Sequence, residues 1–150
     1  MFRNLLVLVD GSTHADRALG EAIDLARAGN GRLTLLSAPI TLPPLAYSGV
    51  GGISATTLSE AAEHDAEHVL RAARDRVPED IPVTTILSEE PIRTAVDKQV
   101  ETGAYDLLVM GSRGRGAVSS MVLGSVSHYV LNHVTLPVLV MRAESVGEAE

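Results

Sequence analysis

Residues 106–125 read DLLVMGSRGRGAVSSMVLGS, an apolar run that leads directly into a segment rich in glycine and serine. The run at 107–110 predicts a buried strand, and Gly111, Gly114 and Gly124 follow it at the spacing Gly-x2-Gly-x9-Gly. Glycine lets the backbone approach a ligand closely and adopt positive φ. A helix that begins near Ser125 would direct unpaired N–H groups and its positive dipole end at an anion. The segment therefore predicts a strand, a phosphate-binding loop and a helix.

Further segments predict strands of the same sheet. Residues 5–9 and 138–141 are apolar without alternation, as 107–110 are, which is typical of parallel strands covered on both faces. Residues 33–38 and 83–87 are less purely apolar and complete a set of five strands. Their order in the sheet cannot be read from these patterns.

Between the expected strands, apolar residues recur at helical spacing. The stripes run through residues 15–26, 58–77, 92–100 and 126–133. Alternation of strand and helix predicts an open, doubly wound α/β fold with a parallel sheet and about four helices, in which ligands bind outside the carboxyl ends of strands. Residues 39–57 lack periodicity and are expected to form a long connection, of the kind that is often a lid or disordered.

Composition limits the classes of protein to consider. A chain of 150 residues fits one domain, expected at 1–143, followed by an acidic tail at 144–150 that is expected to fray. A net charge of -7 and 3% aromatic residues argue against general nucleic-acid binding. The absence of cysteine excludes disulfides and thiol catalysis. The apolar run near the amino terminus is too short for a signal peptide or a membrane span, so a cytoplasmic protein without membrane insertion is expected.

Several well-known catalytic and nucleotide motifs do not fit. The glycine segment has no Gly-Lys-Ser/Thr, so the P-loop lysine and the hydroxyl that holds Mg²⁺ are missing. The first strand is followed by DGSTHAD, which does not match the dinucleotide fingerprint Gly-x-Gly-x-x-Gly. The Gly-x-Ser-x-Gly elbow of serine hydrolases is also absent from the sequence. No catalytic residue or protein metal ligand is therefore assigned.

The glycine pattern and its surroundings resemble the ATP-binding members of the universal stress protein family. The match comprises Gly111, Gly114, Gly124 and Ser125, and it extends to VSHYVLNHVTLPVLVMR at 126–142 and LLVLVDGS at 5–12. The resemblance implies the strand order 3-2-1-4-5, which would bring Asp10 and Gly111 to one crevice at the point where the order reverses.

The resemblance also implies a binding site for ATP, with Mg²⁺ or Mn²⁺ as a possible companion. Asp10 would accept hydrogen bonds from the ribose or the adenine amino group, although Asp10, Ser12 and Thr13 are equally good helix N-caps. The Ala38 backbone would contact the base, and Arg113 and Arg115 would add positive charge. The implied binding residues are Asp10, Gly11, Ser12, Ala38, Met110, Gly111, Arg113, Gly114, Gly124, Ser125 and Val126.

By the same resemblance, the expected function is that of an ATP-binding stress-response protein whose nucleotide occupancy acts as a switch. Little or no turnover is expected, because no residue is placed to orient an attacking water. One alternative is a slow ATPase or self-phosphorylating enzyme that uses Ser119, Ser120 or Ser125, and another is a partner-binding module that does not use nucleotide. The apolar last strand implies a homodimer through Val138, Leu139, Val140 and Met141.

The histidines are interpreted individually. His64 and His68 lie four residues apart on an expected helix, where a solvated face is the simpler interpretation than a metal site. His133 falls on an apolar stripe and is expected to be a buried structural residue. His14 is close to Asp10 in sequence, and whether it lies beside the phosphates is left open.

Overall fold

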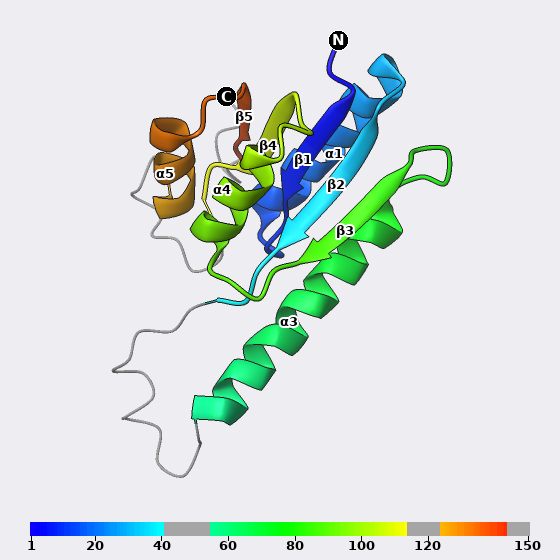
Figure 1. The fold of residues 1–150 in the computed structure, drawn as a ribbon. Helices are drawn as coiled ribbons and strands as arrows, with labels where there is room; N and C mark the ends of the chain where they lie inside the picture. Colours follow the sequence, from blue (N-terminus) through cyan, green and yellow to red (C-terminus); the bar gives the residue numbers. More distant parts are fainter. Residues whose placement is uncertain (41–54, 114–123, 144–150) are drawn as a thin grey trace, which may run out of the picture.

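The computed structural model of the chain describes residues 1–40, 55–113 and 124–143. Its sheet contains β1 (Asn4–Leu8), β2 (Arg32–Ser37), β3 (Val83–Leu87), β4 (Leu107–Gly111) and β5 (Val138–Met141). All neighbouring strands are parallel, and their order is β3-β2-β1-β4-β5 (Figure 1). The expected five-stranded parallel sheet and its order are confirmed.

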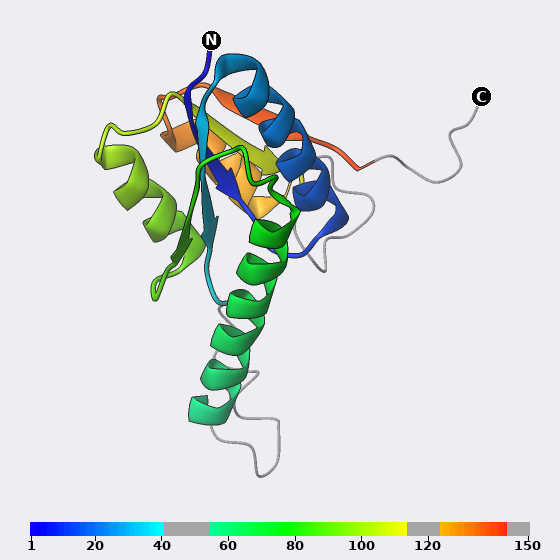
Figure 2. The same cartoon turned by 90° about the vertical axis from the view of Figure 1, so that its right-hand side faces the viewer.

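Helices cover both faces of the sheet, as a doubly wound fold requires. In the described residues these helices are α1 (Thr13–Gly29), α3 (Ala55–Arg76), α4 (Ile92–Glu101) and α5 (Ser125–His133). α1 and α3 pack on one face, and α4 and α5 on the other (Figures 1 and 2). The predicted number and order of helices are therefore confirmed.

The core has two parts because side chains of a strand alternate between its faces. In β1, Leu5 and Val7 belong to the cluster under α1 and α3, while Leu6 and Leu8 belong to the cluster under α4 and α5. These four side chains are at most 7% exposed. A strand buried on both faces explains why the sequence of β1 is apolar without alternation.

Two details differ from expectation. α3 begins at Ala55, within the expected connection 39–57, whose residues 41–54 lie outside the described part of the chain. The first turns of α3 extend beyond the sheet, so they need no apolar stripe to mark them in the sequence (Figure 1). The residues of β5 are only half-buried, because β5 is an edge strand with one strand neighbour in the sheet.

None of the helices in residues 1–40, 55–113 and 124–143 is both long enough and apolar enough to cross a lipid bilayer.

Candidate functional site

A cavity of about 500 Å³ opens at the carboxyl ends of β1 and β4. Strand order reverses here, since β1 pairs with β2 on one side and with β4 on the other. Most of the expected site residues line this cavity: Asp10, Ala38, Met110, Gly111, Arg113, Gly124, Ser125 and Val126. The topology thus brings together segments that lie far apart in the sequence.

Three hydrogen bonds fix the junction between the end of β4 and the start of α5. The Ser112 carbonyl accepts from the Gly124 N–H at 2.7 Å and from the Ser127 hydroxyl at 2.8 Å. The Ser127 Oγ also lies 3.0 Å from the Gly124 carbonyl. Ser112 and Ser127 are almost fully buried. The direction in which α5 starts is therefore set by residues on both sides of the glycine segment.

The first turn of α5 faces the cavity with its backbone donors. Gly124 is the N-cap, with φ -77° and ψ 169°, and no side-chain cap bond is made there. The first N–H groups of a helix have no intrahelical partner, and the helix dipole adds partial positive charge at this end. Ser125 and Val126, the first residues of α5, line the cavity. The arrangement suits an anionic group.

Gly111 has a structural role that the sequence did not suggest. A Cβ at this position would lie 2.7 Å from the Ala15 nitrogen and equally close to two atoms of His14. Gly111 does not have a positive φ, so the need for glycine here does not come from a left-handed backbone conformation. Its missing side chain instead lets the first turn of α1 pack against the end of β4.

Asp10 and its neighbours form the turn between β1 and α1. Asp10 is half-buried, and its Oδ1 accepts from the Ser12 N–H at 2.8 Å. Ser12 is the N-cap of α1, because its Oγ accepts from the Ala15 N–H at 3.1 Å. Gly11 has φ 83°, which favours glycine. Gly11 and Ser12 therefore shape the turn, whereas Asp10 lines the cavity.

His14 belongs to the first turn of α1, and its side chain contacts the segment that follows β5. Its Nδ1 accepts from the Ala143 N–H at 2.9 Å and lies 3.2 Å from the Ser112 Oγ. Burial and the positive charge of Arg113 lower the pKa of His14, and Asp10 acts in the opposite direction. The imidazole is thus held neutral as a hydrogen-bond acceptor, and it is not among the residues that line the cavity.

The wall opposite the helix start is apolar. Ile40 and Ile92 line it together with Pro39 and Pro91, and Ile40 is 53% exposed despite its size. Sequence reasoning missed these residues because they carry no motif. The rule that ligands bind beyond strand carboxyl ends would have pointed to them, since they follow β2 and β3.

A polar cluster stands at one edge of the cavity. The Arg93 guanidinium carbon lies 5.2 Å from the centre of the Tyr129 ring, and Arg93 lines the cavity. The Tyr129 hydroxyl donates to Asp97 Oδ2 at 2.5 Å, and this hydrogen bond raises the pKa of Tyr129. The Arg93 guanidinium of α4 therefore packs on the Tyr129 ring of α5, whose hydroxyl is fixed by Asp97.

His133 is exposed, so the expectation of a buried histidine is wrong. Its ring stacks on Tyr129 with centroids 4.1 Å apart, and its Nδ1–H donates to the Tyr129 carbonyl at 2.8 Å. His133 follows the apolar stripe in spacing, but it lies in the last turn of α5 and belongs to neither core cluster. His64 and His68 are also exposed, on α3.

Several residues that were singled out in the sequence lie outside the described part of the chain. They are Gly114, Arg115, Ser119 and Ser120, and the tail 144–150. Ser125 is described, and its side chain is exposed.

Comparison with known proteins gives a consistent result over nearly the whole chain. The model of the universal stress protein family matches residues 1–142. Universal stress protein YxiE of Bacillus subtilis is 31% identical over 151 aligned residues, which cover 95% of this chain and all of that protein.

Solved structures share the fold. Universal stress protein UspA from Lactobacillus plantarum superposes with a TM-score of 0.75 at 26% identity, covering 93% of this chain and 97% of that one. A universal stress protein family protein from Arabidopsis thaliana, solved with AMP bound, gives a TM-score of 0.68 at 16% identity, with 95% and 93% covered. A universal stress protein in complex with cAMP gives 0.65 at 24% identity, with 95% and 99% covered.

Proposed function

Because the chain belongs to the universal stress protein family, we propose that it binds an adenine nucleotide, ATP by preference, in the cavity between β1 and β4. Nucleotide occupancy, rather than turnover, is its regulatory output. The observation that carries the proposal is the meeting of an apolar wall, the Asp10 carboxylate and the start of α5 in one cavity of about 500 Å³. That volume lies within the range of small-molecule sites.

The apolar wall is the proposed position of the adenine ring. Ile40 and Ile92 would contact the faces of the base, and the backbone at Ala38 would contact its edge. Covering the half-exposed Ile40 removes apolar surface from water, which contributes to affinity at roughly 25 cal/mol per Å². Nucleotide-bound relatives support adenine as the base, since AMP and cAMP were found in proteins of this fold.

Asp10 is the proposed partner of the ribose. Its Oδ1 already accepts the Ser12 N–H, but a carboxylate has about four acceptor positions in all, which leaves capacity for a ribose hydroxyl. The bond to Ser12 also restricts rotation of the side chain. Asp10 therefore needs little reordering when a ligand binds.

The start of α5 and the Arg113 side chain are the proposed phosphate contacts. The protein carries a net charge of -7, so an anionic ligand requires a local positive end. Backbone N–H groups of Ser125 and Val126 supply it without mobile side chains, and Arg113 lines the same cavity. Gly114 and Arg115 are proposed to complete this end for the longer chain of ATP.

A metal ion, Mg²⁺ or Mn²⁺, would enter with the phosphates. Mg²⁺ usually keeps several waters and takes one or two protein carboxylates in addition to phosphate oxygens. Asp10, a single carboxylate at the cavity, fits that pattern. The ion would supply charge neutralisation to the phosphates.

We also propose that the chain forms a homodimer through β5. Val138, Leu139, Val140 and Met141 form an apolar strand at the edge of the sheet, and an apolar edge favours pairing with another strand. The site and this edge are directly linked, because the Ser112 N–H donates to the Met141 carbonyl at 2.7 Å. This link offers a route from occupancy to assembly. Light scattering that gives a monomer at micromolar concentration would refute the dimer.

The proposed nucleotide site is tested by binding to two variants of the full chain. Asp10→Ala should lower the affinity for Mg-ATP at least about tenfold, because it removes a charge-assisted hydrogen bond. Asp24→Ala, an exposed α1 position with the same change in charge, should leave the affinity within about twofold. Calorimetry measures both, and GTP in place of ATP reports on base selectivity.

A thermal shift gives an independent check. Nucleotide at a hundred times its dissociation constant should stabilise the protein by about 2.7 kcal/mol, or about 5 to 10 °C for a chain of this size. Protein freed of any copurified nucleotide that shows no shift with ATP, ADP or AMP would refute the proposal. Steady-state turnover above about 1 s⁻¹ would instead favour an enzyme.

A further inference from the structure

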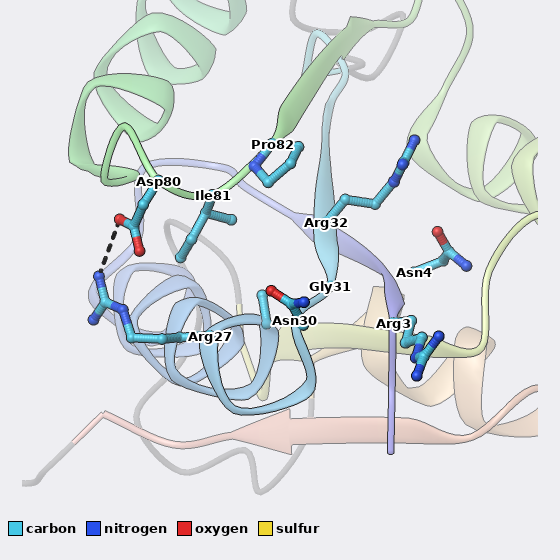
Figure 3. Close-up of a pocket in the computed structure, with 10 residues that line it drawn as sticks. Arg3, Asn4, Arg27, Asn30, Gly31, Arg32, Asp80, Ile81 and Pro82 are labelled. Carbon is cyan, nitrogen blue, oxygen red and sulfur yellow. Dashed lines mark hydrogen bonds and ion pairs between the residues drawn. The ribbon is translucent and has the colours of Figure 1, made fainter.

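A second pocket, of about 420 Å³, lies at the opposite end of the sheet, beside the amino ends of β1, β2 and β3. Arg3 and Asn4 line it from the start of β1, and Arg32 from the start of β2. Arg27 of α1 and Asp80, which precedes β3, lie on the other side of the pocket (Figure 3). The proposed nucleotide site shares none of these residues.

The backbone that carries Arg3 and Arg32 is held rigidly. The Arg32 N–H donates to the Arg3 carbonyl at 2.7 Å. The two oxygens of the Asp106 carboxylate accept from the N–H groups of Arg3 and Asn4, at 3.0 and 3.1 Å. Gly31 packs so closely that a Cβ there would lie 2.6 Å from the Arg3 carbonyl oxygen. The backbones of the two arginines are therefore anchored next to each other, while their guanidinium groups lie apart, with Asn4 between them (Figure 3).

The charges around the pocket do not balance. The Arg27 Nη2 lies 3.5 Å from Asp80 Oδ1, so these two side chains form an ion pair. Within residues 1–40, 55–113 and 124–143, the guanidinium groups of Arg3 and Arg32 have no ion-pair or hydrogen-bond partner. With the Asp106 carboxylate on the Arg3 and Asn4 N–H groups, three arginines and two aspartates stand around the pocket. One positive charge is therefore in excess there, in a protein whose net charge is -7.

Compensation of the α1 dipole does not account for these two arginines. A cation near the last turn of a helix is favourable, and Arg27 occupies that place in α1. Arg3 and Arg32 lie outside the helix, at the beginnings of neighbouring strands. The last carbonyls of α1 are also occupied, because the Ala26 carbonyl accepts from the Gly31 N–H at 2.8 Å.

We propose that this pocket binds a small phosphate-bearing anion, such as inorganic phosphate or a phosphate monoester. A guanidinium presents a planar pair of donors that matches phosphate oxygens, and a phosphate monoester near neutral pH carries about -1.5 to -2 charges. Such a group has enough acceptor oxygens for both Arg3 and Arg32, whose guanidinium groups are not ion-paired, whereas a single carboxylate would match one of them. Asn4 and Asn30 add amide donors to the same pocket.

The experiment follows amide resonances of the full chain during titrations with inorganic phosphate, glycerol phosphate and acetate. Saturable shifts at Asn30, Gly31 and Arg32 with both phosphates, and a response to acetate at least about tenfold weaker, are expected. Shifts with glycerol phosphate but not with inorganic phosphate would identify a monoester as the ligand. Shifts confined to Ser125 and Val126, or no saturable response at the pocket, would overturn the proposal.

Variants separate a specific site from general charge attraction. The double variant Arg3→Gln, Arg32→Gln should weaken phosphate binding at the pocket by at least about tenfold. A control that removes two exposed charges on α3, Arg71→Gln with Arg74→Gln, should leave binding within about twofold. Equal loss in both double variants would mean that net charge alone attracts the anion, and the proposal would fail. Unfolding temperatures without phosphate verify that each variant is folded.

Discussion

The carboxyl end of the sheet and its amino end each carry a cavity, of about 500 and about 420 Å³, but the two are built from different groups. At the carboxyl end, apolar side chains and the start of α5 dominate, and much of the polarity comes from the backbone. At the amino end, arginine side chains provide the charge. The two cavities therefore differ in chemistry: one presents apolar side chains and the start of a helix, and the other presents arginine side chains.

Both ends nevertheless use a glycine to bring two backbone segments into contact. Gly111 admits the first turn of α1 beside β4, and Gly31 admits the residues before β1 beside the α1–β2 turn. A Cβ at either position would approach backbone atoms to 2.7 Å or less. At both cavities, the glycine is therefore required for backbone packing, whether or not it also contacts a ligand.

The largest expected effect comes from replacing one of these two glycines, which tests each end of the sheet separately. Gly111→Ala and Gly31→Ala should each destabilise the fold by about 3 kcal/mol, because backbone atoms cannot move aside as a flexible side chain can. Gly111→Ala should weaken ATP binding, and Gly31→Ala should weaken phosphate binding at the amino end. Urea unfolding measures the first effect, and calorimetry or amide resonances the second.

The matched control is Gly20→Ala, in the middle of α1, where a Cβ would meet nothing within 4 Å. Replacing a helical glycine with alanine should stabilise the protein by about 0.5 to 1 kcal/mol. If Gly111→Ala proved as harmless as Gly20→Ala, the packing role assigned to Gly111 would be wrong.

A smaller effect concerns how the carboxyl end is held together. Ser127→Ala should cost about 1 to 2 kcal/mol, because it removes the buried hydroxyl that bonds the Ser112 carbonyl. Ser125→Ala, at an exposed position two residues earlier, should change stability by less than about 0.5 kcal/mol. Equal unfolding midpoints in urea for these two variants would show that the β4–α5 junction does not depend on Ser127.

A further effect, smaller still, is a pH dependence of stability at the carboxyl end. The pKa of His14 is lowered in the fold, by burial first and then by Arg113, so the unfolded chain takes up a proton before the folded one does. The contribution of His14 to the free energy of unfolding is therefore complete above the ordinary histidine pKa, and it falls as the pH drops below about 6.5. His14→Gln should unfold with a flatter dependence between pH 7 and 5, whereas His64→Gln, on the exposed face of α3, should not. Identical pH profiles for the two variants would contradict this role.

The last prediction is an unchanged affinity for ATP, which tests whether the two ends of the sheet act independently. The double variant Arg3→Gln, Arg32→Gln should bind Mg-ATP within about twofold of the parent, because exposed charges at the far end of the sheet are screened by salt. A clear loss of ATP affinity, measured by calorimetry at physiological ionic strength, would mean that the two ends are coupled.

The predictable parts of the fold are those where burial controls the residue type. β1, β2 and β4 occur within one residue of their predicted bounds, because buried parallel strands must be apolar. The edge strands β3 and β5 occur at the predicted bounds although their residues are half-buried or exposed. The strand order was implied by family resemblance and not by any pattern in the strands. The start of α3 was missed, because a helical turn that contacts no core needs no apolar residue.

Residues of the candidate site could be predicted where they belong to a sequence motif. Residues that only the strand topology brings together could not. Asp10, Gly124 and Ser125 were expected and do line one cavity. Ser112 and Ser127 were missed, because no sequence pattern distinguishes them from other serines. Only the fold brings the Ser127 hydroxyl to the Ser112 carbonyl. The arginine pocket was missed too, since Arg3 and Arg32 meet only when their strands pair.

The anchoring of Ser112 to Gly124 and Ser127 has a consequence for how such a protein diversifies. In the described residues, bonds between the two ends of the connection, at Ser112, Gly124 and Ser127, hold β4 and α5 together. Lengthening the connection therefore costs mainly closure entropy, about 0.6 kcal/mol for each doubling. Insertions and substitutions within it can therefore alter ligand contacts while the strand and helix keep their places. New ligand preferences can therefore arise by changes in this one short connection, while the sheet and the helices stay the same.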